Sequence, residues 1–464
     1  MVVAAAGLIA LAAVLTLRLG PAPAVATVVL SGVVSVLALR RFAALDLLVV
    51  AVLLVLLLPA RYRFAPLGAA GTPAALLGLL SFGVWSLGAA LRRPWMAVRR
   101  HPLRWALLAV LVSVLLSYVA TGYRPHDQLE SKAADRGLVT MVSLLGLALL
   151  AADVVHTRAA VARVVRALAG GGAAVAGLGI LTYGTGIDPT SILRLPGFTF
   201  IPSDYAADRA GFVRIVSTTA HPIELSVVLA MALPLTLWVA FTSTGRARSW
   251  WWLAVGLVAV AIPMTVSRTG VLGLLVGLLV MLPSWSWRRR IQVLVIGSAG
   301  LVAMRLAIPG LLGTLRSYLF TPAQDPSLLS RAAGRATAVK LVEQRPFLGR
   351  GFGTFLPQRY TFLDNQVLLS AVETGALGLL ALAALFLTGI GLGLSTVRTA
   401  HRVDASDEAG LAVALLASLA VSVSAWLTYD ALSFSTSRAV TFVVLGLLAA
   451  HWRVLREEVV ALRS

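Results

Sequence analysis

The sequence has no cysteine among its 464 residues. Disulfide bonds and metal sites built on thiolates are therefore excluded. Histidine is also scarce, with six residues in the chain, and no two of them stand at the HxxxH spacing of a helical metal site. The sequence predicts neither a metal ion nor another cofactor.

Charged residues make up only 12% of the chain, whereas 59% are hydrophobic and the mean hydropathy is +0.91. Apolar surface of this extent cannot be buried in a water-soluble fold. Many apolar runs reach the roughly 20 residues that a helix needs to cross a bilayer, and they are continuous rather than alternating as in barrel strands. The clearest are residues 43–59, 138–155, 250–266, 271–285 and 291–308. We therefore expect an all-α polytopic membrane protein with about 14 transmembrane helices, and at least about 12.

Arginine-rich segments between the apolar runs predict the orientation, because basic loops of membrane proteins stay in the cytoplasm. Residues 2–17 lack the basic start of a signal peptide, so we expect them to form a retained first helix. Alternation from there places these basic segments on one side: residues 40–41, 92–104, 158–166, 246–248, 288–290, 398–402 and 453–456. We predict a multi-pass protein of the cytoplasmic (inner) membrane with both termini in the cytoplasm. The net charge of +20 follows from this topology, and we expect no nucleic-acid partner.

The same alternation leaves two long segments on the outer face, residues 184–224 and 309–366. They separate N-terminal helices (1–183), central helices (225–308), and C-terminal helices with a cytoplasmic tail (367–464). All other outward-facing connections are short.

The larger outer segment contains DPSLLSRAAGRATAVKLVEQRPFLG, which predicts an amphipathic helix beginning after Asp325. Arg331 and Arg335 share one face of this helix, and Arg350 follows it. Because guanidinium groups bind phosphate in a bidentate manner, these arginines are candidates for binding a phosphate or pyrophosphate. The alternatives are a solvated face, attraction to anionic lipid headgroups, or a helix that only covers the bundle.

Polar residues gather where several predicted helices meet the outer face. They are Arg214, His221, Arg268, Asp364 and Glu373, and they come from separate parts of the chain. An arginine at the centre of a bilayer costs roughly 2.5–3.5 kcal/mol on insertion scales, so such a residue usually faces a cavity or a partner. An interfacial arginine whose head group reaches water is the alternative for Arg268.

Four stretches carry a resemblance to a known family: RIVSTTAHP, MTVSRTG, SRAAGRATAVKLVEQRPFLGRGFGTF and LDNQVLLSAVETGALGLL. In this order and spacing, over residues 214–380, they resemble the O-antigen ligase and polysaccharide polymerase superfamily. Those proteins are GT-C-type membrane glycosyltransferases that use undecaprenyl-pyrophosphate-linked sugars on the outer face. The resemblance implies a lipid-linked glycan donor, an acceptor glycan or lipid, and association with envelope polysaccharide assembly proteins.

The resemblance also implies roles for single residues. It makes Arg214 and Arg268 functional arginines and places the large outer segment over the active site, where Arg331, Arg335 and Arg350 help to hold the pyrophosphate. The ligases have a His-Asn motif before the next helix, whereas this chain has Asp364-Asn365. That departure favours an exopolysaccharide or capsule polymerase over a ligase.

The transfer reaction needs a base for the acceptor hydroxyl and cations for the departing phosphate. Asp364 is the first candidate for the base, with helix N-capping as its alternative role. His221 is the second candidate, unless it only starts the following helix. Asn365 is expected to contact substrate. Glu373 lies about 13 Å along its helix, where it either orients an arginine, lines the cavity or forms an ion pair within the bundle.

Two other classes of membrane protein have the same general composition. A transporter or lipid flippase also has many spans and intramembrane charges, but its charges are expected near the midplane, in repeats or broken helices. A peptidoglycan polymerase shares the lipid carrier and normally has fewer spans.

Overall fold

The computed structural model describes residues 43–93, 96, 101–193, 195, 197–201, 212–320 and 326–461. The predicted first helix at residues 2–17 and the basic pair at residues 40–41 lie outside the described residues. Asp325 lies outside them as well. The side chain of Arg331 is likewise not described, although its backbone is.

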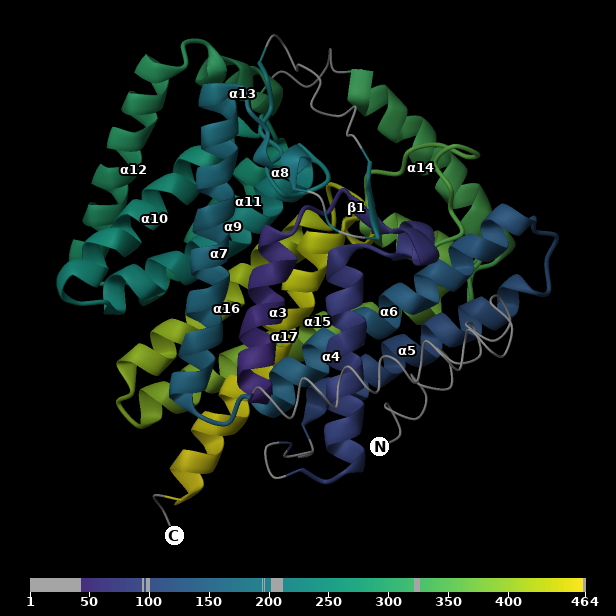
Figure 1. Cartoon of the computed structure of the whole chain (residues 1–464), viewed down its shortest axis with the longest axis horizontal. Coiled ribbons are helices and arrows are strands. Elements are labelled where there is room, and N and C mark those ends of the chain that lie inside the picture. Colours follow the sequence, from purple (N-terminus) through teal and green to yellow (C-terminus); the bar gives the residue numbers. More distant parts are fainter. Residues whose placement is uncertain are drawn as a thin grey trace.

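The described part of the chain is a bundle of helices, ten of which are long and apolar enough to cross a membrane (Figure 1). This confirms the prediction of an all-α polytopic membrane protein. The ten are α4 (Pro73–Ala90), α5 (Pro102–Thr121), α6 (Gln128–Val154), α7 (Arg158–Thr185), α9 (Pro222–Thr242), α10 (Gly245–Met264), α12 (Trp287–Ala307), α15 (Gln366–Arg402), α16 (Ser406–Ala425) and α17 (Ser435–Ala461). Two shorter apolar helices, α3 (Ala44–Leu57) and α11 (Arg268–Met281), accompany them.

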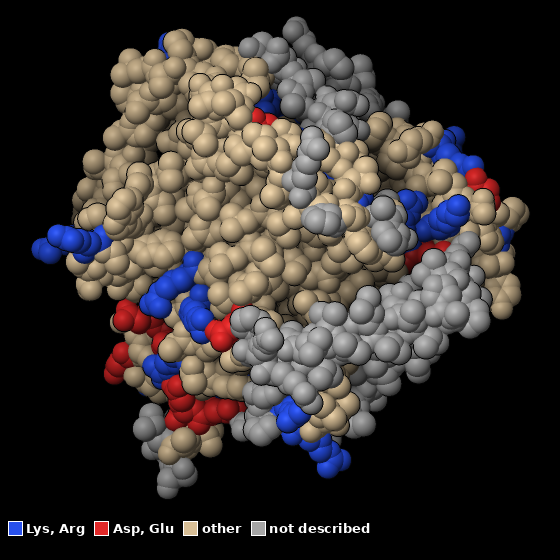
Figure 2. Space-filling view, viewed as in Figure 1, with Lys and Arg blue, Asp and Glu red and all other residues tan. Residues whose placement is uncertain are grey.

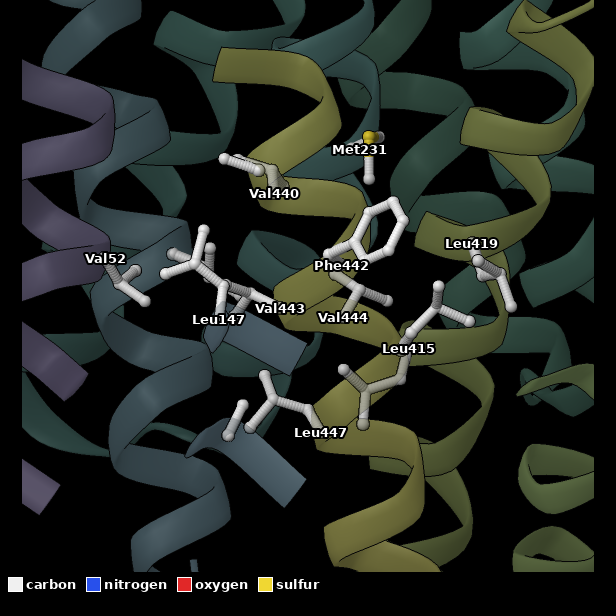
Figure 3. Close-up of a cluster of buried hydrophobic side chains, with 14 of the residues drawn as sticks. Val52, Leu147, Met231, Leu415, Leu419, Val440, Phe442, Val443, Val444 and Leu447 are labelled. Atoms are coloured by element: carbon white, nitrogen blue, oxygen red, sulfur yellow. The ribbon is translucent and has the colours of Figure 1, made fainter. Parts of the chain in front are cut away.

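The core of the bundle surrounds α17 and α6. Phe442 is fully buried and lies beside Met231 of α9 and Leu415 of α16, while Leu147 of α6 lies on the other side of α17 (Figure 3). Helix α12 lies at the edge, and most of its side chains are exposed, as expected for a lipid-facing helix.

Small residues let the central helices approach closely. A Cβ atom added at Gly146 of α6 would lie 2.3 Å from the carbonyl oxygen of Gly78 in α4, and one at Gly446 of α17 would lie 2.4 Å from that of Ala148. Such close backbone contacts are typical of membrane helices, which associate through packing rather than through the hydrophobic effect.

A two-stranded antiparallel sheet covers one end of the bundle. Strand β1 (Tyr62–Phe64) pairs with β2 (Phe198–Phe200), so that Arg63 lies opposite Thr199. The rings of Tyr62 and Phe200 lie 5.3 Å apart between centroids. The short helix α8 (Pro189–Ile192) lies nearby, and Arg61 forms a 2.8 Å ion pair with Asp188 just before it.

The larger predicted outer segment forms α13 (Leu311–Phe320), α14 (Pro326–Gln344) and a glycine-rich turn before α15. Helix α14 corresponds to the predicted amphipathic helix. The turn contains Gly349, Gly351 and Gly353, all with positive φ, as the glycine-rich sequence GRGFGTF requires.

The glycine-rich turn packs into a break in α15. Gly375 interrupts the helix with φ 62° and ψ −164°. Beyond the break, the Ala376 N–H donates to the Pro346 carbonyl at 2.8 Å. Before it, the Glu373 carbonyl accepts the N–H of Gly351 at 2.9 Å. The turn therefore satisfies backbone groups that the break releases.

Charged side chains are concentrated at the ends of helices (Figure 2). One group lies where α3 and α7 begin and α17 ends, and it includes the Arg158–Glu458 ion pair and the 2.7 Å pair between Arg163 and Asp46. A broad uncharged face separates this group from the charged residues near α14 (Figure 2).

Candidate functional site

The N-terminal ends of α9, α11 and α15 meet one loop at the end of the bundle where the two-stranded sheet lies. Helix α9 contacts α11 through a 3.1 Å hydrogen bond from Ser226 to Ser267. Helix α11 contacts the loop at residues 426–434, which precedes α17, through Thr269 and Thr428. The same loop holds the start of α15, because the Gln366 N–H donates to the Trp426 carbonyl at 2.8 Å.

Arg214 lies beside the segment that leads into Arg268. Its Nε donates to the Thr265 carbonyl at 2.8 Å, and only 8% of the residue is exposed. Arg268 is the first residue of α11 and is half-buried. The structure thus brings together the two arginines to which the family resemblance assigns a role.

Backbone strain marks both arginine segments. Ser217 and Val266 have φ of 55° and 48°, a conformation that is rare for residues other than glycine and an outlier for a β-branched one. Each such residue costs on the order of 1–3 kcal/mol, and such residues concentrate at functional sites.

His221 is the N-cap of α9. Its Nδ1 accepts the N–H of Ile223 at 3.1 Å, and its ring lies 5.8 Å from that of Phe434. This contact matches the helix-starting role that the sequence left open.

Asn365, and not Asp364, is the N-cap of α15. Its Oδ1 accepts the N–H of Leu368 at 3.0 Å, and its Nδ2 donates to the Leu427 carbonyl at 3.0 Å. The capping role considered for Asp364 therefore belongs to its neighbour. Asp364 is half-buried directly before the cap.

Asp430, in the loop before α17, is a charged neighbour that the sequence reasoning missed. Burial raises the pKa of Asp430 to about 7, and the carboxylate of Asp364 adds to this rise. The signal in the sequence was a single acidic residue inside the apolar stretch WLTYDALSF.

Glu373 lies in α15 and packs against the glycine-rich turn. Its Oε1 accepts the N–H of Phe355 at 3.1 Å, and its backbone carbonyl accepts the Ser117 hydroxyl at 2.6 Å. The carboxylate thus orders the turn that fills the break in α15.

Arg350 belongs to a polar network between the turn and α6. Its Nη2 donates to the Tyr360 hydroxyl at 2.5 Å and lies 3.7 Å from Oε1 of Glu130. Tyr360 in turn donates to Glu130 at 2.6 Å, and Arg124 forms a 2.5 Å ion pair with the same carboxylate. The Arg350 guanidinium is therefore engaged by side chains of the protein itself.

Arg335 is exposed on α14, which packs over the start of α15. A Cβ atom at Gly334 would lie 2.9 Å from the carbonyl oxygen of Phe362, so Arg335 follows a residue in close contact with the segment that leads to Asp364. The side chain of Arg331 is outside the described part.

The structure therefore brings Arg214, His221, Arg268, Asp364 and Asn365 to one end of the bundle. It places Glu373 and Arg350 at the glycine-rich turn. Within the described ranges, no group of three or more His, Cys, Asp or Glu side chains is arranged to hold a metal ion. The candidate residues at this end of the bundle offer guanidinium, carboxylate and imidazole groups.

Residues 252–383 match the O-antigen ligase family model. This match confirms the predicted resemblance to the O-antigen ligase and polymerase superfamily, and it supports a membrane glycosyltransferase of the O-antigen ligase type. The matched O-antigen ligase region runs from α10 past the break in α15, and it includes Arg268 and Asp364. Arg214, His221 and Asp430 lie outside it. A search of curated proteins found no match to the chain.

Proposed function

We propose that the protein transfers a polyprenyl-pyrophosphate-linked glycan to a sugar hydroxyl at the outer face of the cytoplasmic membrane, as a surface polysaccharide polymerase. The observation that carries this proposal is the meeting of Arg214, Arg268 and Asp364 at one end of the bundle, in a chain with an O-antigen ligase domain.

In this reaction the acceptor oxygen attacks the anomeric carbon of the donor. The bond between that carbon and the pyrophosphate oxygen breaks, and the carrier pyrophosphate leaves. Arg214 and Arg268 stabilise the charge that develops on the leaving group, because guanidinium groups hold phosphate oxygens in a bidentate manner and stay charged.

Asp364 accepts the proton that the acceptor hydroxyl loses. It is half-buried, and Asn365 performs the capping that would otherwise explain a polar residue at this position. A correctly placed base contributes roughly 10²–10⁴ to the rate of such a transfer. His221, whose Nδ1 is used by the α9 backbone, is the second candidate for this step.

A polymerase fits better than a ligase because the motif before α15 is Asp364-Asn365. The outer face fits the site because the predicted long outer segments, residues 184–224 and 309–366, contribute Arg214, His221 and Asp364. Long segments cross the membrane largely regardless of their charge, so the arginines in them do not oppose this topology.

The test is the lipid-linked glycan profile of a strain that lacks the gene, compared with the same strain carrying it. A polymerase predicts that single repeat units accumulate on the polyprenyl carrier. Full-length chains that remain on the carrier would instead identify a ligase. An unchanged pool of outward-facing carrier would contradict both activities and would favour a transporter instead.

A further inference from the structure

A cluster of aromatic rings holds an arginine where the end of α9, α10 and the turn between α11 and α12 meet. The Phe241 ring lies 5.2 Å from that of Trp252 in α10 and 5.7 Å from that of Trp285, between centroids. The guanidinium carbon of Arg289 lies 5.0 Å from the centroid of the same Phe241 ring. This cation–π contact positions the side chain, and its N–H groups can still donate to an acceptor.

The length of α9 separates this ring cluster from the candidate functional site. Helix α9 has 21 residues and is therefore about 30 Å long. His221 caps its first turn, and Phe241 lies in its last turn. Because this length is about the thickness of the hydrocarbon core, we expect the ring cluster at the opposite interface of the membrane. Under the predicted topology that interface faces the cytoplasm, where the membrane surface is negative.

Arg290 fixes the turn between α11 and α12. Its Nε donates to the carbonyl oxygens of Leu282 and Trp285, both at 3.1 Å. The side chain of Trp285 is buried in the same turn. The first turn of α12 therefore has a defined position, and it exposes the two other arginines, Arg288 and Arg289.

The positive charge of this turn is not balanced by the protein. No acidic residue occurs between Glu224 and Asp325 in the sequence. In the described part of the chain, neither Arg288 nor Arg289 forms an ion pair. At the edge of the molecule where α10 and α12 meet, Figure 2 shows Lys and Arg atoms without Asp or Glu atoms beside them. Both guanidinium groups can therefore bind an anion from outside the chain.

An exposed apolar face continues from this turn along α12. Trp287, which is 71% exposed, stands four residues before Ile291 and seven before Leu294, so helical spacing places the three on one face. Arg288 stands three residues before Ile291 and seven before Val295, and all of these side chains are exposed. Within the described ranges α12 packs mainly against α10 and α13, which leaves this face to the bilayer. Tryptophan at the start of such a helix is typical of the membrane interface.

A phospholipid with a net negative headgroup fits these features. Its phosphate can accept hydrogen bonds from both guanidinium groups, and its acyl chains can lie along the apolar face of α12. A zwitterionic headgroup also carries a cation, which Arg288 and Arg289 repel. Free phosphate has no apolar part to cover the exposed face.

We propose that Arg288 and Arg289, beside the ring cluster of Phe241, Trp252 and Trp285, form a binding site for an anionic phospholipid. The acyl chains of this lipid pack on α12 and help to hold a helix that lies at the edge of the bundle. The site uses none of the residues assigned to glycan transfer, so the inference does not rest on the proposed function.

The test measures thermal unfolding of the purified full-length protein in detergent with added dioleoyl phosphatidylglycerol or dioleoyl phosphatidylcholine. Phosphatidylglycerol should raise the unfolding temperature more than phosphatidylcholine, because it binds the folded state more tightly. In Arg288→Gln/Arg289→Gln, the concentration of phosphatidylglycerol that gives half of this effect should increase about fivefold for each arginine removed. Both positions are exposed, so the variant is expected to fold.

Arg398→Gln/Arg402→Gln is the matched control. It removes two exposed arginines near the C-terminal end of α15, and in the described chain neither of them lies over an aromatic ring. This variant should keep the preference of the parent for phosphatidylglycerol.

Three outcomes would overturn the inference. Equal stabilisation of the parent by both lipids would exclude a site for an anionic headgroup. An equal loss of the phosphatidylglycerol effect in both double variants would mean that general surface charge attracts the lipid. Inorganic phosphate that stabilises the parent as well as phosphatidylglycerol does would assign the two arginines to a free anion instead of a lipid.

Discussion

Thr269 and Thr428 share a hydrogen bond of 3.0 Å between their hydroxyl groups, although 159 residues separate them in the sequence. Thr269 follows Arg268. Thr428 lies in the loop whose backbone carbonyl groups accept hydrogen bonds from Asn365 and Gln366. The position of the α11 arginine therefore depends on a loop outside the O-antigen ligase region. The geometry of the candidate site is a property of the whole bundle.

Arg268→Lys should lose most glycan transfer while the protein still inserts in the membrane. Lysine preserves the charge but cannot bind two phosphate oxygens in one plane, so we expect a loss of about ten- to a hundredfold. The measurement is transfer by membranes with equal amounts of protein, with Arg246→Lys at an exposed site as the control. Activity near that of the control would remove Arg268 from the site.

Asp364→Asn should abolish transfer without lowering the unfolding temperature. An asparagine cannot accept the proton from the acceptor hydroxyl, and the helix cap is provided by Asn365 in either protein. Asn365→Ala removes the helix cap and should lower the free energy of unfolding by about 0.5–2 kcal/mol. A fully active Asp364→Asn variant would move the role of base to His221.

Composition and the lengths of apolar runs were enough to predict the membrane fold, because crossing a bilayer imposes both on a helix. The start of α9 after His221 and the helix after Asp325 were also readable from local signals. The break at Gly375 was not, since its backbone groups are satisfied by a turn that begins some thirty residues earlier, near Pro346. The small sheet was missed for the same reason, because β1 and β2 are far apart in the sequence.

Among the candidate site residues, the sequence motifs identified those that lie at helix starts, such as Arg268 and Asp364. Asp430 was missed because nothing local distinguishes it from an ordinary loop charge. Its significance depends on its burial and on the carboxylate of Asp364 in the folded chain, and that is a tertiary property.

Glu373→Leu should destabilise the protein by about 1–3 kcal/mol, because the buried N–H of Phe355 loses its acceptor. Glu373→Gln keeps an oxygen at this position and should retain most of the stability and activity. Unfolding temperature and transfer are measured for both variants. A glutamine variant with normal stability but no activity would show that Glu373 acts on substrate or on an arginine instead of on the turn.

Gly375→Ala should destabilise the protein by at least about 3 kcal/mol or prevent its folding. The φ and ψ of Gly375 are essentially restricted to glycine, and an added Cβ atom would lie 2.4 Å from the carbonyl group of Phe347. Gly391→Ala is the control in the same helix, because a Cβ atom there meets open space. That variant should be neutral or more stable by up to about 1 kcal/mol.

Asp430→Asn should stabilise the protein most at alkaline pH. The pKa of Asp430 rises from 3.8 to about 7 on folding, so the folded state binds the proton more tightly than the unfolded state. This contribution to stability is fully present below pH 3.8 and is lost as the pH rises through 7, and it amounts to at most about 4 kcal/mol. Asparagine does not titrate, so the difference in unfolding temperature between variant and parent should grow from pH 5 to pH 8.

Asp188→Asn supplies the opposite trend as a control. Burial of Asp188 favours its neutral form, but hydrogen bonds from Thr190 and Arg61 hold the pKa below its usual value. The Asp188 carboxylate therefore stabilises the folded protein above the pKa it has in the unfolded chain. This stabilisation is lost as the pH falls through the pKa of Asp188 in the folded protein, so Asp188→Asn should be most destabilised near neutral pH.

A constant difference between Asp430→Asn and the parent from pH 5 to pH 8 would mean that Asp430 does not titrate in this range. The carboxyl groups of Asp364 and Glu373 interact with Asp430, so the same measurement on Asp364→Asn shows how much of the pH dependence belongs to the pair.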